Sequence, residues 1–267
     1  MTKILNHINT YANLTAYNND KDKNYPNIAY IQETNEVKWV KEKVDLVEGI
    51  VVCKYNVTST TEETYLLGST TGITYQIIDD VKQDTVQATY TFDTLGEHTV
   101  KYKLDGTSIG SWAFSDCSKL TAVEIPNSVT LIGDSAFSKC SSLTSVRIPN
   151  SVTSINYSAF SKCSSLTSVE IPNSVTEIGE WAFNNCSGLT SVTIPNSVTE
   201  IGMHAFESCT GLTSVTINAT TPPTLDDTNA FDDTNNCPIY VPAESVNAYK
   251  TATNWSELSG RISAIVA

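Results

Sequence analysis

The sequence lacks any long apolar run, and it is poor in charged residues, in basic residues and in histidine. No stretch approaches the roughly 18 apolar residues that a membrane-spanning helix needs. Only 17% of the 267 residues are charged, and 16 basic against 29 acidic side chains give a formal net charge of −13. This charge repels polyphosphate backbones and anionic membrane surfaces. We therefore expect no nucleic-acid partner and no membrane insertion.

The start of the chain shows no export signal. The apolar run within residues 1–8 breaks too early for a secretory signal. We expect an extracellular, cell-surface or virion location, reached either with a leader that this chain does not carry or by release inside a virus particle.

What the sequence does contain is a repeat of 23 residues, in five copies. The unit reads C-S-x-L-T-S-V-x-I-P-N-S-V-T-x-I-G-x-x-A-F-x-x. A match of this length over five copies is a specific signal for a repeat architecture. The cysteine and phenylalanine columns are Cys117, Cys140, Cys163, Cys186, Cys209 and Phe114, Phe137, Phe160, Phe183, Phe206.

Each unit predicts two short strands joined by turns. The segment L-T-S-V-x-I, for example residues 143–148, has the form of a leucine-rich-repeat strand with its apolar side chains facing inward. Pro149 and its equivalents end that strand, and S-V-T-x-I-G forms a second extended run. We expect the following glycines, replaced once by Asn156, to allow a bend with positive φ. The A-F segment is too short for more than a single helical turn, and its phenylalanine should fill the coil.

These columns resemble the BspA-like leucine-rich repeats of bacterial surface proteins, over roughly residues 107–267. The resemblance implies a β-rich solenoid of five coils over residues 105–217, stabilised by stacking because no single coil can bury its own apolar face. It also implies the role of an adhesin that binds proteins or other cells. Residues 218–267 should form a degenerate coil and a C-terminal cap, with Trp255 and Ile262 completing the seal.

The residues before the repeat predict two further parts. Five candidate strands within residues 48–104 favour a small immunoglobulin-like β-sandwich, with a β-rich cap fused directly to the solenoid as the competing interpretation. Residues 1–47 predict an attachment module with a hairpin between residues 28 and 40, vaguely similar to N-terminal pieces of phage tail and fibre proteins.

Nothing in the sequence predicts catalysis, a cofactor or a metal site. The 23-residue spacing of the cysteines is not a metal-ligand spacing, and free cysteine packs as a small buried hydrophobe. His7, His98 and His204 lie in three different units. The acidic loop after Leu225 does not follow the calcium-loop pattern and has no glycine for the sharp turn, so a solvated loop is expected.

The columns that vary between coils are the candidates for ligand contact, because fixed columns serve the shared core. Exposed aromatic residues dominate interface hot spots and sugar stacking. The alternative is that the two tryptophans pack onto neighbouring coils. The hypothesis assigns ligand binding to an aromatic edge and a charged strand face, with the residues Trp112, Tyr157, Trp181, His204 and Glu124, Arg147, Glu170.

Two functions follow from these observations. The first is a non-enzymatic adhesion module that binds a protein or glycan on another surface. The second is a structural or receptor-binding component of a phage tail or fibre, docked through residues 1–47. Because a fibre component assembles, a stable trimer would favour the second function and a monomer the first.

Overall fold

The computed structural model describes residues 29–31, 37–39 and 49–265, and the chain divides into two units, Met1–Val47 and Glu48–Ala267. In the first unit, β1 (Ala29–Ile31) pairs in antiparallel fashion with β2 (Val37–Trp39), as the predicted hairpin requires. The rest of the predicted attachment module, with His7, lies outside the described residues.

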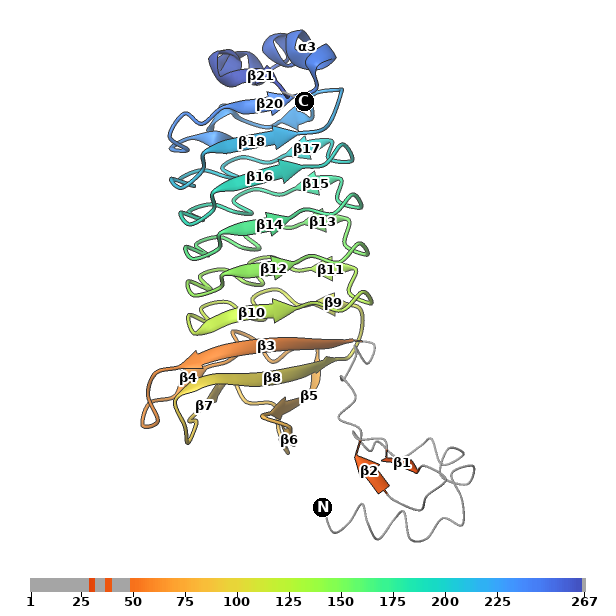
Figure 1. The fold of residues 1–267 in the computed structure, drawn as a ribbon, viewed down its shortest axis with the longest axis vertical. Coiled ribbons are helices and arrows are strands. Elements are labelled where there is room, and N and C mark those ends of the chain that lie inside the picture. Colours follow the sequence, from red (N-terminus) through yellow and green to blue (C-terminus); the bar gives the residue numbers. More distant parts are fainter. Residues whose placement is uncertain (1–28, 32–36, 40–48, 266–267) are drawn as a thin grey trace. The chain divides into compact units, whose positions relative to one another are not determined.

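The second unit is a stack of coils, each of which contributes one strand to each of two sheets (Figure 1). Within a coil the chain runs along the first sheet, turns after the proline and returns along the second sheet. Both sets of coil strands pair in parallel, in the register set by the 23-residue period up to the last pair of the second set, where Glu200 is opposite Thr224. The first set is β10 (Leu120–Glu124), β12 (Ser145–Arg147), β14 (Ser168–Glu170), β16 (Ser191–Ile194) and β18 (Ser214–Ile217). The second set is β9 (Ser108–Ile109), β11 (Leu131–Ile132), β13 (Ser154–Ile155), β15 (Glu177–Ile178), β17 (Glu200–Ile201) and β19 (Thr224–Leu225).

A column of stacked phenylalanines fills the space between the two sheets. The rings of neighbouring coils lie nearly parallel, with centroids 5.3 Å apart between Phe137 and Phe160 and 5.5 Å apart between Phe160 and Phe183. The column ends against Tyr102 on one side and Trp255 on the other. This continuous apolar column, which no coil could complete alone, holds the stack together.

The repeated cysteines are free and buried, as expected of structural thiols. The Cys163 thiol donates a hydrogen bond to the carbonyl of Phe137, 3.2 Å away in the preceding coil, and the other inner coils repeat this contact. Burial raises the pKa of the Cys163 thiol well above its usual value and that of Cys209 to about 12. The thiols therefore remain protonated and serve the packing.

The glycines of the bend have a different role from the predicted one. None of Gly133, Gly179 and Gly202 has a positive φ. A β-carbon on Gly202 would lie 2.6 Å from a backbone nitrogen of the preceding coil, which is closer than a carbon atom can approach. The close approach of successive coils therefore selects glycine here. The positive φ occurs two residues later, in the column that contains Trp112 and Trp181.

Residues 49–104 form a cap on the first coil. Their strand β3 (Ile50–Val57) pairs in antiparallel fashion with β10, so four cap strands join the first sheet, which numbers eleven strands with the two that follow the coils. The apolar side chains of the cap join the core of the solenoid. The predicted separate immunoglobulin-like sandwich is not confirmed, and the arrangement is that of the competing β-rich cap. The cap strands are β3 (Ile50–Val57), β4 (Thr64–Tyr65), β5 (Ile73–Ile78), β6 (Val81–Lys82), β7 (Thr89–Tyr90) and β8 (Gly96–Leu104).

The other end of the stack closes with short helices and two more parallel strands. The buried Trp255 donates from its indole nitrogen to the carbonyl of Pro223 at 2.8 Å, and Ile262 is buried as well, as a seal requires. The acidic loop is partly structural, because the Asp227 side chain caps a 3-10 helix by accepting from the backbone nitrogen of Asn229. The elements are η1 (Thr228–Phe231), β20 (Ile239–Val241), η2 (Ala243–Ser245), α3 (Val246–Thr251), η3 (Trp255–Arg261) and β21 (Ile262–Ala264).

Candidate ligand-binding surfaces

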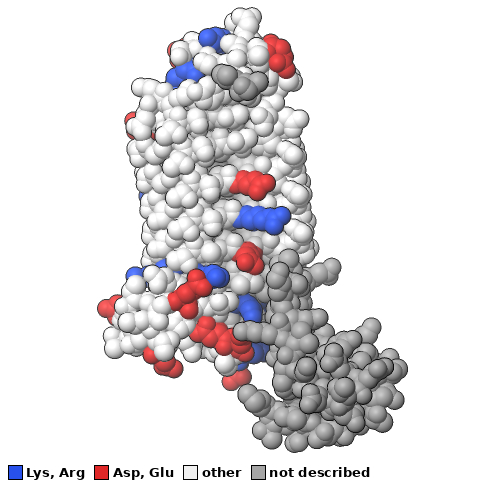
Figure 2. Space-filling model, in the orientation of Figure 1, with Lys and Arg blue, Asp and Glu red and all other residues white. Residues whose placement is uncertain are grey.

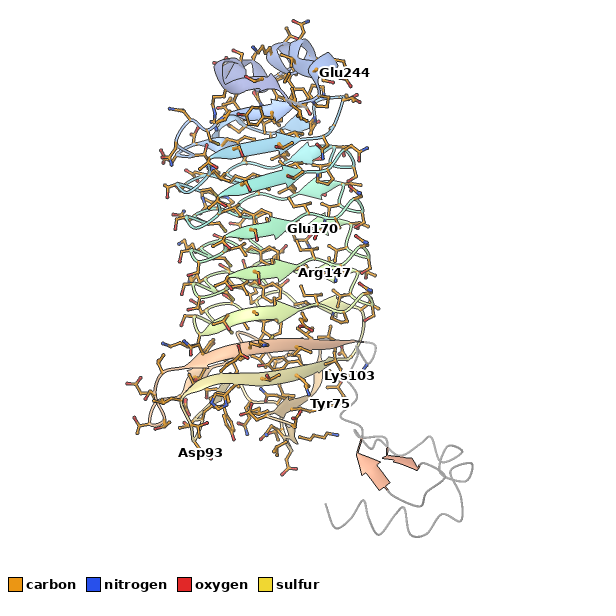
Figure 3. All side chains as sticks on the ribbon, in the orientation of Figure 1. Tyr75, Asp93, Lys103, Arg147, Glu170 and Glu244 are labelled. Carbon is orange, nitrogen blue, oxygen red and sulfur yellow. The ribbon has the colours of Figure 1, made fainter. Side chains whose placement is uncertain are left out.

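The charged strand face lies on the first sheet. Arg147 is directly opposite Glu124 on one side and Glu170 on the other in the parallel ladders. Figure 2 shows an acidic, a basic and an acidic side chain following one another along the stack, and Figure 3 labels Arg147 and Glu170. All three are exposed, and none of the ion pairs found in the described part of the chain involves them. Their charges are therefore available to a partner.

The hydroxyls of the threonines that lead into these strands donate to the backbone of the preceding coil. The hydroxyl of Thr144 donates to the carbonyl of Thr121 at 3.1 Å, and Thr167 and Thr190 repeat the contact one coil further each time. The hydrogen of each of these hydroxyls is therefore engaged within the stack, whereas its oxygen can still accept a hydrogen bond from a ligand.

The aromatic edge follows the second sheet. The side chains of Trp112 and Tyr157 are 55% and 48% exposed, so neither is a core residue. Trp181 is half-buried and stacks on His204, with ring centroids 4.0 Å apart. The predicted alternative, packing onto a neighbouring coil, thus describes part of Trp181 but does not describe Trp112.

The side chain of Asn229 holds His204 in place by hydrogen bonds. Asn229 accepts from the backbone nitrogen of His204 through its oxygen, and its amide nitrogen lies 3.2 Å from the imidazole Nε2. The other ring nitrogen, Nδ1, lies 3.0 Å from a Glu207 carboxylate oxygen, within ion-pair distance but without the angle of a hydrogen bond. His204 therefore supports the ring of Trp181 from one side.

The backbone does not favour bulky residues at the aromatic edge. Trp112, Trp181 and His204 have φ values of 62°, 60° and 57°, in the left-handed region. An L-residue adopts this conformation at a cost of about 1–2 kcal/mol, which glycine avoids. Ser135 and Ser158 occupy the same column in the two coils between the tryptophans. The fold therefore accepts tryptophan at these positions but does not need it.

The structure separates the two predicted surfaces. Glu124, Arg147 and Glu170 belong to the first sheet, whereas Trp112 and Trp181 follow strands of the second sheet, and the phenylalanine column lies between the sheets. One flat partner cannot contact both surfaces at once. The seven predicted residues thus form two candidate surfaces.

Sequence reasoning did not single out a third feature, an acidic column in the second sheet. Glu177 and Glu200 lie directly opposite each other in the ladder of β15 and β17. Burial raises the pKa of the Glu200 carboxyl, and the negative charges of Asp226 and Glu177 raise it further. The signal was present in the sequence, because this column reads Leu131, Ser154, Glu177, Glu200, Thr224 along the coils.

The histidines and cysteines form no catalytic or metal-binding constellation in the described part of the chain. His98 belongs to the cap, where its Nδ1 lies 2.6 Å from Asp79, and it does not meet His204. Among the described residues no three side chains of the metal-binding types gather into a site. None of the described helices is long and apolar enough to cross a membrane.

The comparison with protein families assigns the repeat. The model of the BspA type leucine rich repeat region matches residues 107–238 in six copies. Residues 107–238 belong to the BspA-type leucine-rich repeat family. The resemblance drawn from the repeated columns is thereby confirmed, and the matched range extends to residue 238, into the part where the sequence predicts a degenerate coil. Leucine-rich repeats of this type are typically non-enzymatic binding scaffolds.

Solved structures of leucine-rich-repeat proteins are similar to part of this chain. A leucine rich cell surface protein from Faecalibacterium prausnitzii A2-165 shares 37% identity over 42% of this chain and 29% of its own, with a TM-score of 0.41. The T. pallidum leucine rich repeat protein shares 27% identity over 62% of this chain and 84% of its own, with a TM-score of 0.46. The pneumococcal vaccine antigen PcpA shares 19% identity over 62% of this chain and 46% of its own, with a TM-score of 0.48. The chain thus spans less than a third of the Faecalibacterium protein and under half of PcpA. No curated protein matches the sequence significantly.

Proposed function

We propose that this chain is a non-enzymatic adhesion module that binds a protein or glycan on another surface through its aromatic edge. The observation that carries the proposal is Trp112, whose large apolar side chain is 55% exposed at a position where the backbone conformation favours glycine. A large exposed apolar side chain, in a column where serine serves two other coils, points to a role outside folding. The family assignment supports a binding role in general.

The aromatic edge has the properties of an interface hot spot. Tryptophan and tyrosine bury a large area on binding while few side-chain torsions become fixed. Trp112 and Tyr157 are exposed in the free protein, and Trp181 is already ordered by its stack on His204. A preordered ring loses less conformational entropy when a ligand binds. We therefore assign most of the binding free energy to Trp112, Tyr157 and Trp181.

The strand face plays a secondary part in this proposal. The exposed charges of Glu124, Arg147 and Glu170 can orient a charged partner, and charges at an interface rim chiefly affect the association rate. Because this face lies on the other sheet, it contacts either a partner that wraps around the coil or a second partner.

The test is a binding measurement on a panel of immobilised extracellular proteins and glycans, using the full chain. We expect at least one ligand whose affinity falls about 100-fold or more in the variant Trp112→Ala, Tyr157→Ala, Trp181→Ala, because each hot-spot truncation costs about 2 kcal/mol or more. The matched control, Glu124→Thr, Arg147→Thr, Glu170→Thr, introduces the residue that later coils carry in that column and should reduce affinity less than about tenfold. Unchanged binding by the aromatic variant, at an unchanged melting temperature, would refute the proposal.

A further inference from the structure

The C-terminal half of the solenoid has a one-sided charge. Between Lys162 and Lys250 the sequence contains no lysine and no arginine, and His204 is its only side chain that can become cationic near neutral pH. The acidic side chains of this stretch are Glu170, Glu177, Glu180, Glu200, Glu207, Asp226, Asp227, Asp232, Asp233 and Glu244. Within this stretch, therefore, almost no positive charge is available to balance these carboxylates.

Two of these carboxylates oppose each other where the fold does not require them. Glu177 and Glu200 are exposed and in register in the ladder of the second sheet. Directly opposed like charges destabilise a sheet. The same column holds Ser154 in β13 and Thr224 in β19, so uncharged residues fit the same backbone. None of the ion pairs among the described residues involves Glu177 or Glu200.

The acidic column adjoins the aromatic edge. Glu180 follows Glu177 by three residues and occupies the same position of the bend as Tyr157 in the preceding coil. Ser158, the residue after Tyr157, donates from its backbone nitrogen to the carbonyl of Glu180 at 2.9 Å. Trp181 comes next and stacks on His204 with one face. In the preceding coil the position equivalent to Trp181 is Ser158, whose side chain is too small to cover the other face of the indole. Glu177, Glu180 and the partly exposed Trp181 therefore follow one another within five residues of one coil.

Carboxylates beside aromatic faces suit a cation with an extended apolar stem. A lysine or arginine gains from the negative potential of the carboxylates and from the ring quadrupole. A bare divalent ion suits the surface less, because calcium takes six to eight oxygen ligands and the described residues contain no cluster of three metal-binding side chains. An anionic glycan or a nucleic acid would be repelled.

We propose that the acidic-aromatic edge, formed by Tyr157, Glu177, Glu180, Trp181 and Glu200, docks a lysine- or arginine-rich polypeptide segment. The inference rests on the proposed function, in that it names the partner chemistry for one part of the aromatic edge. Coils stack at roughly 4.8 Å, so the acidic column presents its charges at the spacing of parallel strands, and flexible basic side chains of an extended segment can reach successive coils. The surrounding negative charge attracts such a segment over a distance that salt shortens.

The repeat itself supplies matched variants for the test. In Glu177→Ser, Glu200→Thr, each acidic residue takes the identity that a neighbouring coil carries in the same column. In the control, Glu124→Thr, Glu170→Thr, two carboxylates are removed from the opposite sheet, again with a residue that later coils use. Both variants change the net charge from −13 to −11, since each loses two carboxylates. Any difference between them therefore reports position and not total charge.

The measurement is the anisotropy of a fluorescein-labelled decalysine peptide titrated with the full chain at low and at physiological salt. We expect binding that weakens with salt, an affinity about tenfold lower for Glu177→Ser, Glu200→Thr, and less than about a twofold change for the control. Equal weakening in both variants would reduce the effect to net charge and overturn the proposal, as would the absence of peptide binding. A calcium titration that displaces the peptide from the wild-type chain would also overturn it, because the column would then be an ion site.

A second variant separates this inference from the proposed function. Trp181→Phe keeps a ring on His204 but presents a weaker quadrupole to a cation, so we expect a twofold to fivefold loss of decalysine affinity. Suppose that a neutral glycan binds the aromatic edge and that neither the carboxylate variant nor the Trp181 variant changes decalysine binding. This result would refute the cationic partner and leave the proposed function standing. If the wild-type chain bound none of the immobilised proteins and glycans but still bound decalysine as expected, only the proposed function would be refuted.

Discussion

The replacement Phe160→Ala tests the stacked column on which the solenoid depends. Phe160 is fully buried in a middle coil, and its ring is sandwiched between those of Phe137 and Phe183 at 5.3 and 5.5 Å. Truncation of a buried phenylalanine to alanine costs about 3–5 kcal/mol, as lost transfer free energy and as a cavity. We expect a value in the upper half of that range, because rigid coils above and below limit the collapse of the cavity.

Coupling between coils gives a second magnitude. Stacked aromatic pairs contribute about 0.5–1.5 kcal/mol beyond their burial. The double variant Phe160→Ala, Phe183→Ala should therefore cost about that much less than the sum of the two single variants, since the shared stack is lost only once. In Phe160→Ala, Phe231→Ala the two sites are three coils apart, and the costs should add to within about 0.5 kcal/mol.

The assay is urea unfolding of the full chain followed by far-ultraviolet circular dichroism, with the free energy of unfolding as the readout. The control is Tyr157→Ala, an aromatic truncation in the same coil at an exposed position, which should change the stability by no more than about 0.5 kcal/mol. A cost below about 1.5 kcal/mol for Phe160→Ala, or an equal cost for Tyr157→Ala, would show that the column does not carry the stability of the stack.

Two further predictions concern the coil surface. Gly202→Ala should destabilise the chain by about 1–3 kcal/mol, because its β-carbon would meet the backbone of the preceding coil at 2.6 Å, whereas Gly260→Ala, with no atom within 4 Å, should be neutral in the same urea assay. Glu200→Thr should stabilise the chain at neutral pH by less than about 1 kcal/mol, because Asp226 and Glu177 repel this exposed carboxylate. The pKa of Glu200 is raised in the folded state, so the folded wild type binds the proton more tightly than the unfolded chain does. The stability advantage of Glu200→Thr should therefore fall as the pH drops through that pKa. An advantage in melting temperature that stays constant or grows would contradict this reasoning.

The repeat made most of the solenoid predictable from sequence. Fixed columns such as Phe160 and Cys163 identified the core, and the alternation of Val100, Tyr102 and Leu104 with polar residues identified a half-buried strand in the cap. What alternation does not encode is the partner of a strand. β3 pairs with β8 inside the cap and also with β10 of the first coil, and this second pairing makes residues 49–104 a cap and not a separate domain.

The candidate surfaces were less predictable. The variable columns identified Trp112, Tyr157 and Trp181 as one edge and the charges as another face, and the structure shows that the two lie on different sheets. The acidic column was visible in the sequence as well. Its meaning depended on the register that sets Glu177 directly against Glu200.

By itself the sequence determined the period, the core columns and the family, because these follow from residues that recur every 23 positions. Only the tertiary structure decided which exposed residues share a surface, because two residues of one coil that are separated by a turn face opposite sides of the core. It also decided what the side chains offer. The hydroxyl of Thr144 donates to the carbonyl of Thr121, so its hydrogen is not available to a partner.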